Sequence, residues 1–307
     1  MKITDTSDLW WKSAVIYCLD VETFLDWNGD GIGDLAGFVQ RIDYLAELGV
    51  SCIWLMPIYP TPDRDDGYDI TDFYGIDPRL GNHGDFVEVV RTARDRGIRV
   101  IVDLVVNHTS DQHPWFKSAR RSRSSPYRDW YVWSDDPPKT DKKSIVFPDE
   151  EDSVWQWDEQ AGQHYLHRFY KHQPDLNTAN PKVRDELQKV VGFWLQLGVS
   201  GFRVDAVPFF IDPLGVQDQA PADPHDIVRD LRSFISRRQG EAMLLGEVNL
   251  PYEQTASFFG ESGNELQVLF DFPLMQRMYL ALARGDARPI VEALEALVLR
   301  GEAALRG

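Results

Sequence analysis

The chain has 307 residues, 43% of them hydrophobic, which is enough for one large domain or two ordinary ones with a sizeable core. Its 32 Lys and Arg and 49 Asp and Glu give a formal net charge of −17. This charge excludes nucleic acid and anionic membranes as expected partners, and it suits a neutral substrate or bound divalent cations. There is no run of 18 apolar residues that would span a membrane, and residues 1–12 lack the apolar region of a signal peptide.

The two cysteines, Cys18 and Cys52, both lie in apolar runs. We therefore expect two buried free thiols and no disulfide framework. Free thiols are typical of a reducing compartment, so the sequence predicts a cytoplasmic location.

Apolar strands alternate with amphipathic helices along the first hundred residues. Residues 14–19, 50–56 and 98–103 are predicted strands, and residues 35–48 and 86–93 are predicted helices. Alternation with apolar strands is typical of a parallel sheet that is covered by helices on its outside.

After Asn107 this alternation stops. Residues 108–180 are rich in polar, aromatic and proline residues, and we interpret them as an inserted subdomain. Its tryptophans could form platforms for a ligand or could build the core of the insert itself. The alternation then resumes with a helix over 181–197, a strand over 199–205, a helix over 226–237, strands over 242–247 and 267–272, and a last helix over 288–299.

Six such strand–helix units predict an α/β fold of the (β/α)8 TIM-barrel type, with a subdomain inserted after the third strand. A complete barrel needs eight units, so the last two are lacking. We expect residues 1–107 to form the first part of the barrel, 108–180 the inserted subdomain, and 181–307 the continuation of the barrel. A doubly wound open sheet is the alternative, but no glycine-rich dinucleotide loop follows the first strand.

Three predicted strands end in carboxylates: Asp103, Asp205 and Glu247. In a barrel these ends meet at the rim that carries the active site. Arg203 and Asp205 share one face of their strand, either as a structural ion pair or as a nucleophile that a cation keeps ionised. Paired carboxylates at one rim suit glycoside hydrolysis or transfer. A metal-dependent hydrolase is a second interpretation, weakened because no His-x-His pair lies at a strand end.

A loop near the N-terminus resembles the first half of a calcium loop, with Gly31 at the sharp turn. Gly37 stands where the closing Glu of an EF-hand would be, so we expect calcium in a related loop. An Asx-rich turn without an ion is the alternative. The ligand positions are Asp26, Asn28, Asp30, the backbone carbonyl of Ile32, and Asp34.

Several short motifs follow one another along the chain. They are Tyr17, Asp66-Gly-Tyr-Asp69, Asp103-Leu-Val-Val-Asn-His108, Gly201-Phe-Arg-Val-Asp205 and Gly246-Glu247. Together they resemble the conserved blocks of the alpha-amylase superfamily, glycoside hydrolase family 13, from about Trp10 to about Arg288. Further motifs resemble its trehalose synthase subfamily: Asp65-Asp-Gly-Tyr-Asp-Ile70, Tyr131-Val-Trp-Ser134, His172-Gln-Pro-Asp-Leu-Asn177, and residues 107–116.

The resemblance implies a retaining mechanism. Asp205 would be the nucleophile that forms a glucosyl-enzyme, Glu247 the general acid/base, and Arg203 the cation that holds Asp205 ionised. The residues that would grip the glucose ring next to the cleaved bond are Tyr68, Asp69 and His108, with Tyr17 and Asp103 in support.

The resemblance also implies Ca²⁺ as the cofactor, at one or two sites, and no organic cofactor. One site would use Asn107, Asp175, Asp212 and the backbone carbonyls of Phe209 and Phe210. The loop from Asp26 to Asp34 would hold a second ion.

The chain departs from the superfamily pattern beyond Glu247. The third superfamily carboxylate, an Asp preceded by Asn-His, has no counterpart there. The seventh and eighth strands and the C-terminal β-domain are also lacking. An unclosed barrel exposes two strand edges and an apolar interior, so we expect a homo-oligomer or a partner chain to cover the opening.

The expected function is maltose–trehalose interconversion by intramolecular glucosyl transfer, on a small α-glucoside such as maltose, trehalose or a short malto-oligosaccharide. The segment Gly246-Glu-Val-Asn-Leu-Pro251 differs from what trehalose synthases carry around the acid/base. An α-glucosidase or α-amylase hydrolase is therefore the first alternative. An inactive sugar-binding or partner-dependent protein is the second.

Overall fold

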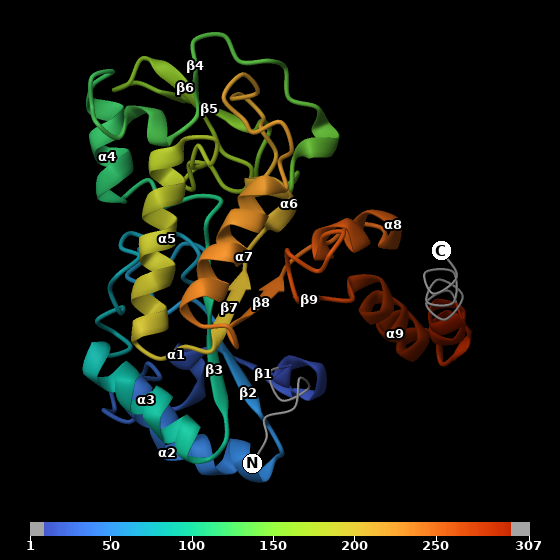
Figure 1. The fold of residues 1–307 in the computed structure, drawn as a ribbon. Coiled ribbons are helices and arrows are strands. Elements are labelled where there is room, and N and C mark those ends of the chain that lie inside the picture. The colour runs from blue at the N-terminus through green and yellow to red at the C-terminus, as the bar shows by residue number, and fades with distance from the viewer. Residues whose placement is uncertain (1–8, 296–307) are drawn as a thin grey trace.

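A computed structural model describes residues 9–295 of the chain. Its centre is a six-stranded parallel sheet with the order β1-β2-β3-β7-β8-β9 (Figure 1). Neighbouring strands thus follow the order of the chain, without the reversal of a doubly wound sheet. The strands are β1 (Ile16–Leu19), β2 (Cys52–Leu55), β3 (Arg99–Leu104), β7 (Gly201–Val204), β8 (Met243–Gly246) and β9 (Val268–Leu269). The prediction of a (β/α)8-type fold that lacks its last units is confirmed for the described residues.

Four long helices cover one face of this sheet: α2 (Leu35–Glu47), α3 (His83–Asp95), α5 (Pro181–Gln196) and α7 (Asp226–Arg238). Side-chain caps fix where they begin. Asp34 accepts a hydrogen bond from the Gly37 N–H at the start of α2, and Asn82 forms a capping box with Asp85 at the start of α3. The large hydrophobic cluster between these helices and the sheet includes the fully buried Trp194.

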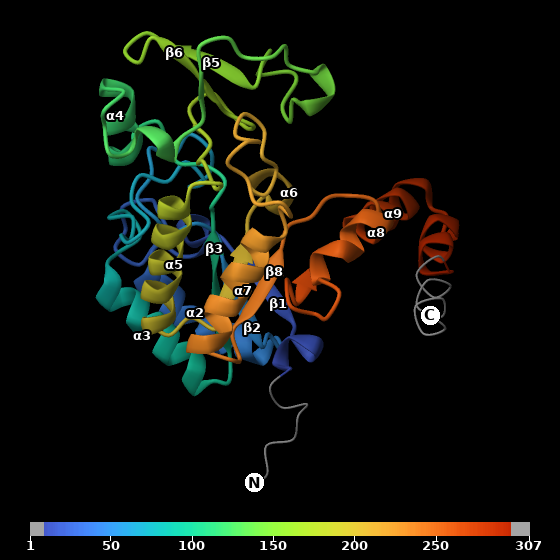
Figure 2. The same cartoon turned by 45° about the horizontal axis from the view of Figure 1, so that its top comes forward.

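A small subdomain lies within residues 108–180 and forms a separate layer beyond the main sheet (Figure 2). The ring centroids of Trp115 and Trp130 lie 4.7 Å apart, and those of the stacked Trp133 and Phe116 rings lie 5.7 Å apart. Trp157, by contrast, is 42% exposed. Most tryptophans of the insert therefore build its own core. Its elements are α4 (Pro114–Arg121), η2 (Arg128–Trp130), η3 (Lys142–Ser144) and an antiparallel sheet of β4 (Trp133–Ser134), β6 (Gln163–Leu166) and β5 (Trp155–Asp158).

The C-terminal part differs from the sequence prediction. Residues 267–272 were expected to be one strand, but only Val268 and Leu269 pair with β8. Asp271 instead accepts a hydrogen bond from the Leu274 N–H at 3.0 Å and begins the unpredicted helix α9 (Phe272–Arg284). The last helix was predicted over residues 288–299, so the part of that prediction beyond residue 295 lies outside the described residues. The remaining elements are η1 (Trp10–Ser13), α1 (Val21–Phe24), α6 (Val207–Phe210), α8 (Tyr252–Thr255) and η4 (Ala256–Phe259).

The second face of the sheet is the barrel interior. A separate hydrophobic cluster lies there, formed by Cys52, Ile101, Met243 and Leu245. Cys18 was expected to be buried, but it is exposed, whereas Cys52 is buried. The reason is that β1 pairs with only one strand, β2, among the described residues. Between residues 9 and 295, no helix has both the length and the apolar character needed to cross a bilayer.

Candidate active site

Arg203 on β7 lies at the centre of a cluster of carboxylates. Its Nη1 donates to Asp103 Oδ1 at 2.6 Å and to Asp205 Oδ1, and its Nη2 lies 2.8 Å from Glu247 Oε2. Asp103 is fully buried, and Arg203 and Asp205 are 5% and 6% exposed. Asp103 and Arg203 are register partners across β3 and β7. The three predicted catalytic residues therefore lie together with Asp103, at the C-terminal ends of three adjacent strands.

The backbone after Asp205 has an unusual conformation. Ala206 has φ = 49°, in the left-handed region that costs a non-glycine residue about 1–2 kcal/mol. Its N–H donates to Glu247 Oε2 at 3.2 Å. Backbone strain of this kind concentrates at functional sites. Here the hydrogen bond from the strained Ala206 to Glu247 links the residues that follow β7 and β8.

The buried Asp103 and Asp205 and the partly buried Glu247 share one guanidinium, so the charges of the cluster do not balance. Burial raises the pKa of Asp103 to about 7, although Arg203 acts against this shift. Burial also raises the pKa values of Asp205 and Glu247. The neighbouring Glu247 carboxyl lowers the pKa of Asp205, whereas the Asp205 carboxyl raises that of Glu247. These opposite effects favour Glu247 as the protonated carboxyl and Asp205 as the ionised one.

The three residues expected to grip a sugar ring lie in two loops, one after β2 and one after β3. The Tyr68 hydroxyl lies 3.4 Å from Arg203 Nη1 and 3.5 Å from Asp103 Oδ2. His108 Nε2 lies 3.3 Å from the Tyr68 carbonyl oxygen, and burial lowers the pKa of His108 to about 4, so its ring is neutral. Tyr68 thus contacts the carboxylate cluster directly, and His108 contacts the backbone of Tyr68.

Asp69 has no solvent exposure and is held by side chains that the sequence analysis did not single out. Its carboxylate accepts hydrogen bonds from Thr61 Oγ1 at 2.7 Å and from Arg64 Nε at 3.4 Å. Arg64 in turn pairs with Asp111. These contacts fix the rotamer of Asp69 beside Tyr68.

Tyr17 is not brought to the cluster. It packs against the hydrophobic core on the helix side of the sheet, and Cys18 alternates with it and faces the interior. Burial, followed by the charge of Asp103, raises the pKa of the Cys18 thiol to about 11. The Cys18 thiol is therefore a β1 group whose ionisation responds to Asp103.

The sequence analysis also missed Trp54 and Tyr59. Trp54 Nε1 donates to Asp103 Oδ2 at 2.6 Å, and the Arg203 guanidinium lies 5.1 Å from the Trp54 ring. The Tyr59 hydroxyl donates to the Asp103 carbonyl oxygen at 2.6 Å. The sequence did contain one signal for Trp54, because an indole N–H on an apolar strand needs a buried hydrogen-bond acceptor.

The loop from Asp26 to Asp34 has the oxygen-rich side chains that calcium prefers. These groups bond to the loop's own backbone: Asp26 accepts from the N–H groups of Gly29 and Gly31, and Asp30 accepts from that of Ile32. Asn28 accepts from Asp30 N, and Asp34 accepts from Trp27 N, Asn28 N and Gly37 N. The donor set suits calcium, but Asp26, Asp30 and Asp34 do not form a group that is arranged to hold a metal ion in this structure.

At the other predicted calcium site, Arg168 provides the positive charge. Its Nη1 donates to Asp212 Oδ2 at 2.8 Å, and its Nε lies 3.4 Å from Asp175 Oδ2. Asn107 Nδ2 donates to Asp175 Oδ1 at 3.1 Å. The carbonyl of Phe209 accepts from Asp212 N, and that of Phe210 from Thr178 Oγ1. Arg168 thus pairs with the carboxylates of Asp175 and Asp212, and the two carbonyls bond to other groups, so this arrangement fits a guanidinium rather than an ion.

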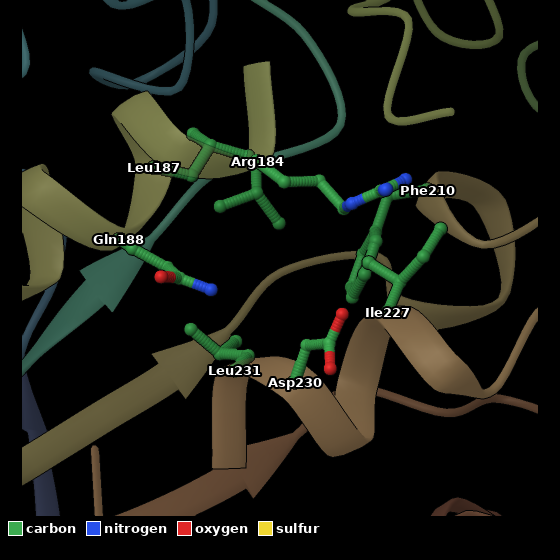
Figure 3. Close-up of a pocket in the computed structure, with 8 residues that line it drawn as sticks. Arg184, Leu187, Gln188, Phe210, Ile227, Asp230 and Leu231 are labelled. Atoms are coloured by element: carbon green, nitrogen blue, oxygen red, sulfur yellow. The ribbon is translucent and has the colours of Figure 1, made fainter. Parts of the chain in front are cut away.

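Across residues 9–295, no group of three or more His, Cys, Asp and Glu side chains is arranged to hold a metal. A cavity of about 30 Å³ lies between α5 and α7 and has room for little more than a water molecule (Figure 3). It is lined in part by Leu187, Gln188, Asp230 and Leu231, none of which belongs to the carboxylate cluster. It is not the candidate active site.

The chain is similar to known proteins over most of its length. The chain is 44% identical over 294 residues to the trehalose synthase/amylase TreS of Mycolicibacterium smegmatis, covering 95% of this chain and 49% of that protein. It is 40% identical over 282 residues to an oligo-1,6-glucosidase of Heyndrickxia coagulans, covering 87% of this chain and 51% of that protein. The chain thus spans about half the length of these curated relatives.

The fold is shared with solved structures. The crystal structure of Bacillus licheniformis trehalose-6-phosphate hydrolase superimposes with a TM-score of 0.79 at 33% identity, covering 87% of this chain and 50% of that one. Residues 19–298 match the family model described as the catalytic domain of alpha amylase. The carboxylate cluster lies inside this matched segment, and the chain belongs to the alpha-amylase family.

Proposed function

We propose that the cluster around Arg203 catalyses retaining glucosyl transfer on small α-glucosides. The observation that carries the proposal is the single Arg203 guanidinium shared by Asp205 and Glu247. The effect of each carboxyl on the pKa of the other, which favours a proton on Glu247 and an ionised Asp205, supports it. A retaining enzyme needs this pairing of an ionised carboxylate with a protonated one.

In the first step Asp205 attacks the anomeric carbon, and the glycosidic bond breaks as Glu247 gives its proton to the leaving oxygen. In the second step Glu247, now ionised, takes a proton from the acceptor hydroxyl, which displaces Asp205 from the sugar. Arg203 stabilises Asp205 as the leaving carboxylate. Tyr68, Asp69 and His108 hold the ring through both steps.

Maltose–trehalose interconversion is the best-supported form of this reaction, because a trehalose synthase/amylase is among the relatives that match 95% of the chain. The acceptor would then be the released glucose, turned within the site. Hydrolysis, with water as the acceptor, is the second candidate, because an oligo-1,6-glucosidase is 40% identical over 87% of the chain.

The test is to incubate the purified chain with maltose and to separate the products by chromatography, with Asp205→Ala as the control. Trehalose in the wild-type reaction alone supports interconversion, and glucose without trehalose supports hydrolysis. Because the superfamily's third carboxylate, an Asp preceded by Asn-His, has no counterpart in these 307 residues, we expect turnover by this chain about 100-fold or more below that of a full-length relative. No product from folded protein would contradict catalysis by this chain alone and favour a sugar-binding or partner-dependent role.

We also propose Ca²⁺ in the loop from Asp26 to Asp34, away from the reacting groups. Its donor set supports this proposal, since hard oxygen ligands at alternate positions suit calcium. The ion would stabilise the entry to α2 through Asp34 and would take no part in the transfer.

A further inference from the structure

Trp54 on β2 contacts both partners of the central ion pair. Its Nε1 donates to Asp103 Oδ2 at 2.6 Å, and its ring centroid lies 5.1 Å from the Arg203 guanidinium. The other oxygen of the same carboxylate, Asp103 Oδ1, accepts from Arg203 Nη1 at 2.6 Å. The two oxygens of Asp103 are therefore divided between the indole and the guanidinium, which also lie against each other.

The register of three neighbouring strands produces this contact. Trp54 pairs with Ile101 across β2 and β3, and Asp103 lies two residues further along β3 on the same face as Ile101. Asp103 in turn pairs with Arg203 across β3 and β7. Because β2, β3 and β7 each have a neighbour on both sides, the indole, the carboxylate and the guanidinium are held in one row by the middle of the sheet.

Asp103 depends on Trp54 for its own hydrogen bond. Arg203 is shared with the two other carboxyls of the cluster, and the Tyr68 hydroxyl lies 3.5 Å from Asp103 Oδ2. Among residues 9–295, Trp54 Nε1 is thus the close donor that serves Asp103 and no other carboxyl. Asp103 has no solvent exposure, so a donor to its carboxylate favours the ionised form that water would otherwise solvate.

The cluster has one guanidinium for three carboxyls, so it tends to retain a proton near neutral pH. Burial raises the pKa of each carboxyl, and that of Asp103 reaches about 7 although Arg203 and the Trp54 hydrogen bond act against the shift. The proton can therefore lie on Asp103 or on Glu247. The donor on Trp54 contacts only the first of these two groups.

We propose that Trp54 is a positioning residue, whose indole N–H holds Asp103 in its ionised form and so leaves the proton of the cluster to Glu247. This role rests on the proposed function, in which Glu247 protonates the leaving oxygen. Without the indole N–H, Asp103 competes for the proton, and Glu247 loses it at a lower pH. Trp54 acts through Asp103 and needs no contact with the sugar.

The surroundings of Asp103 allow its titration to be followed near neutral pH. Burial raises the pKa of Cys18 to about 11, and it raises those of Tyr59 and Tyr68 well above the ordinary value for tyrosine. These three groups therefore stay protonated while the carboxyls titrate. The titratable and charged groups that face Asp103 are Arg203, Asp205, Glu247, Tyr59, Tyr68 and Cys18.

The test is Trp54→Phe, which removes the N–H and keeps an aromatic ring. The 307-residue chain is labelled with ¹³C in its Asp and Glu carboxyls, and Asp103→Asn and Glu247→Gln identify the two resonances. A hydrogen bond to a charged group shifts such an equilibrium by about one to two pH units, so Asp103 should titrate that much higher in Trp54→Phe. Glu247 should titrate at a lower pH than in wild type. In maltose turnover, the basic limb of kcat/KM against pH should move to lower pH as well.

Trp133→Phe in the insert is the matched control. Trp133 Nε1 donates to the Arg128 carbonyl oxygen at 2.9 Å, and the Arg128 guanidinium lies 3.7 Å from the centroid of the Trp133 ring. The substitution thus removes the same kind of donor from beside the same kind of cation. It should leave the titrations of Asp103 and Glu247 as they are in wild type.

Equal titration midpoints for Asp103 in wild type and in folded Trp54→Phe would overturn the proposal and leave Trp54 as a packing residue. If Trp54→Phe does not fold, the ¹⁵N-labelled indoles of wild type take its place. One of the 10 indole resonances should then follow the titration of Asp103 and be displaced in Asp103→Asn, and the absence of such a resonance would equally overturn the proposal.

The carboxyl and indole titrations need no sugar turnover. A wild-type chain that titrates as expected but forms no product would therefore contradict the proposed function and leave the effect of Trp54 on Asp103 intact. Product formation with unchanged titrations in Trp54→Phe would do the reverse.

Discussion

At the residue scale, Arg203 organises the site. Its guanidinium contacts carboxylates from three strand ends and also lies 5.1 Å from the Trp54 ring and 5.5 Å from the Tyr68 ring. Removing one partner of a buried ion pair usually costs about 3–5 kcal/mol, because the remaining charge has no counter-ion. Arg203 therefore contributes to the stability of the rim as well as to the ionisation of Asp205.

Asp103 gives a prediction about pH. Its pKa is about 7 in the folded chain, against about 3.9 in an unfolded one. A carboxyl with a raised folded pKa stabilises the fold fully below the unfolded pKa, and this contribution is lost as the pH rises through about 7. In wild type, Asp103 should therefore lower the free energy of unfolding by up to roughly 1.4 kcal/mol per pH unit between pH 4 and 7.

Urea unfolding of wild type and Asp103→Asn at pH 5, 6 and 7 measures this effect, since asparagine does not titrate. The wild type should lose more stability across this range than the variant does. The exposed Asp95→Asn serves as the control and should follow the wild type. Parallel curves for wild type and Asp103→Asn would contradict the assignment.

At the element scale, close contact between β7 and β8 sets the position of Arg203 and Asp205. Gly201 begins β7 with φ = 154°, and a Cβ built there would meet the Met243 carbonyl oxygen at 2.2 Å. The register Gly201–Met243 and Val204–Gly246 then places the end of β7 beside Glu247. Only glycine at this position allows the two strands to approach so closely.

Gly201→Ala should therefore destabilise the chain by about 2 kcal/mol or more, through overpacking and an unfavourable φ together. Gly192→Ala in α5 is the matched control, because its added Cβ would lie 3.7 Å from Phe234 Cζ, an ordinary contact. Alanine is favoured over glycine in a helix by about 1 kcal/mol, so this control should be neutral or stabilising. The melting temperatures of both variants, measured by thermal unfolding, test this prediction. Equal changes in melting temperature would contradict the argument that Gly201 is needed for close packing of β7 on β8.

At the scale of the whole molecule, the insert is joined to the barrel by polar contacts. Arg168, which follows β6 of the insert, pairs with Asp175 and with Asp212, which follows α6 in the barrel part. Burial raises the pKa of Asp175 to about 7. The loop from Asp26 to Asp34 lies elsewhere, between α1 and α2, so removal of its proposed ion should not affect this connection.

The proposed calcium can be tested on the melting temperature of the whole chain. At a calcium concentration 100 times its Kd, binding to the folded state alone adds about 2.7 kcal/mol, which raises the melting temperature by several degrees. EDTA should reverse this shift, and Asp30→Asn should reduce it, while Asp95→Asn should behave as wild type. A wild-type melting temperature that does not respond to calcium would contradict an ion in this loop.

The sequence by itself determined the order of the strands, four of the five predicted helices to within about three residues, and the carboxylates Asp103, Asp205 and Glu247 at the strand ends. Local periodicity and caps encode these features, because each depends on neighbours in the chain. Only the tertiary structure decided that Tyr17 faces the helices and Cys18 the interior, that Trp54 donates to Asp103, and that Arg168 stands among the predicted calcium ligands. Those outcomes depend on the pairing of strands that are distant in the chain and on which cation pairs with a buried carboxylate. Such long-range contacts produce no periodic pattern in the sequence.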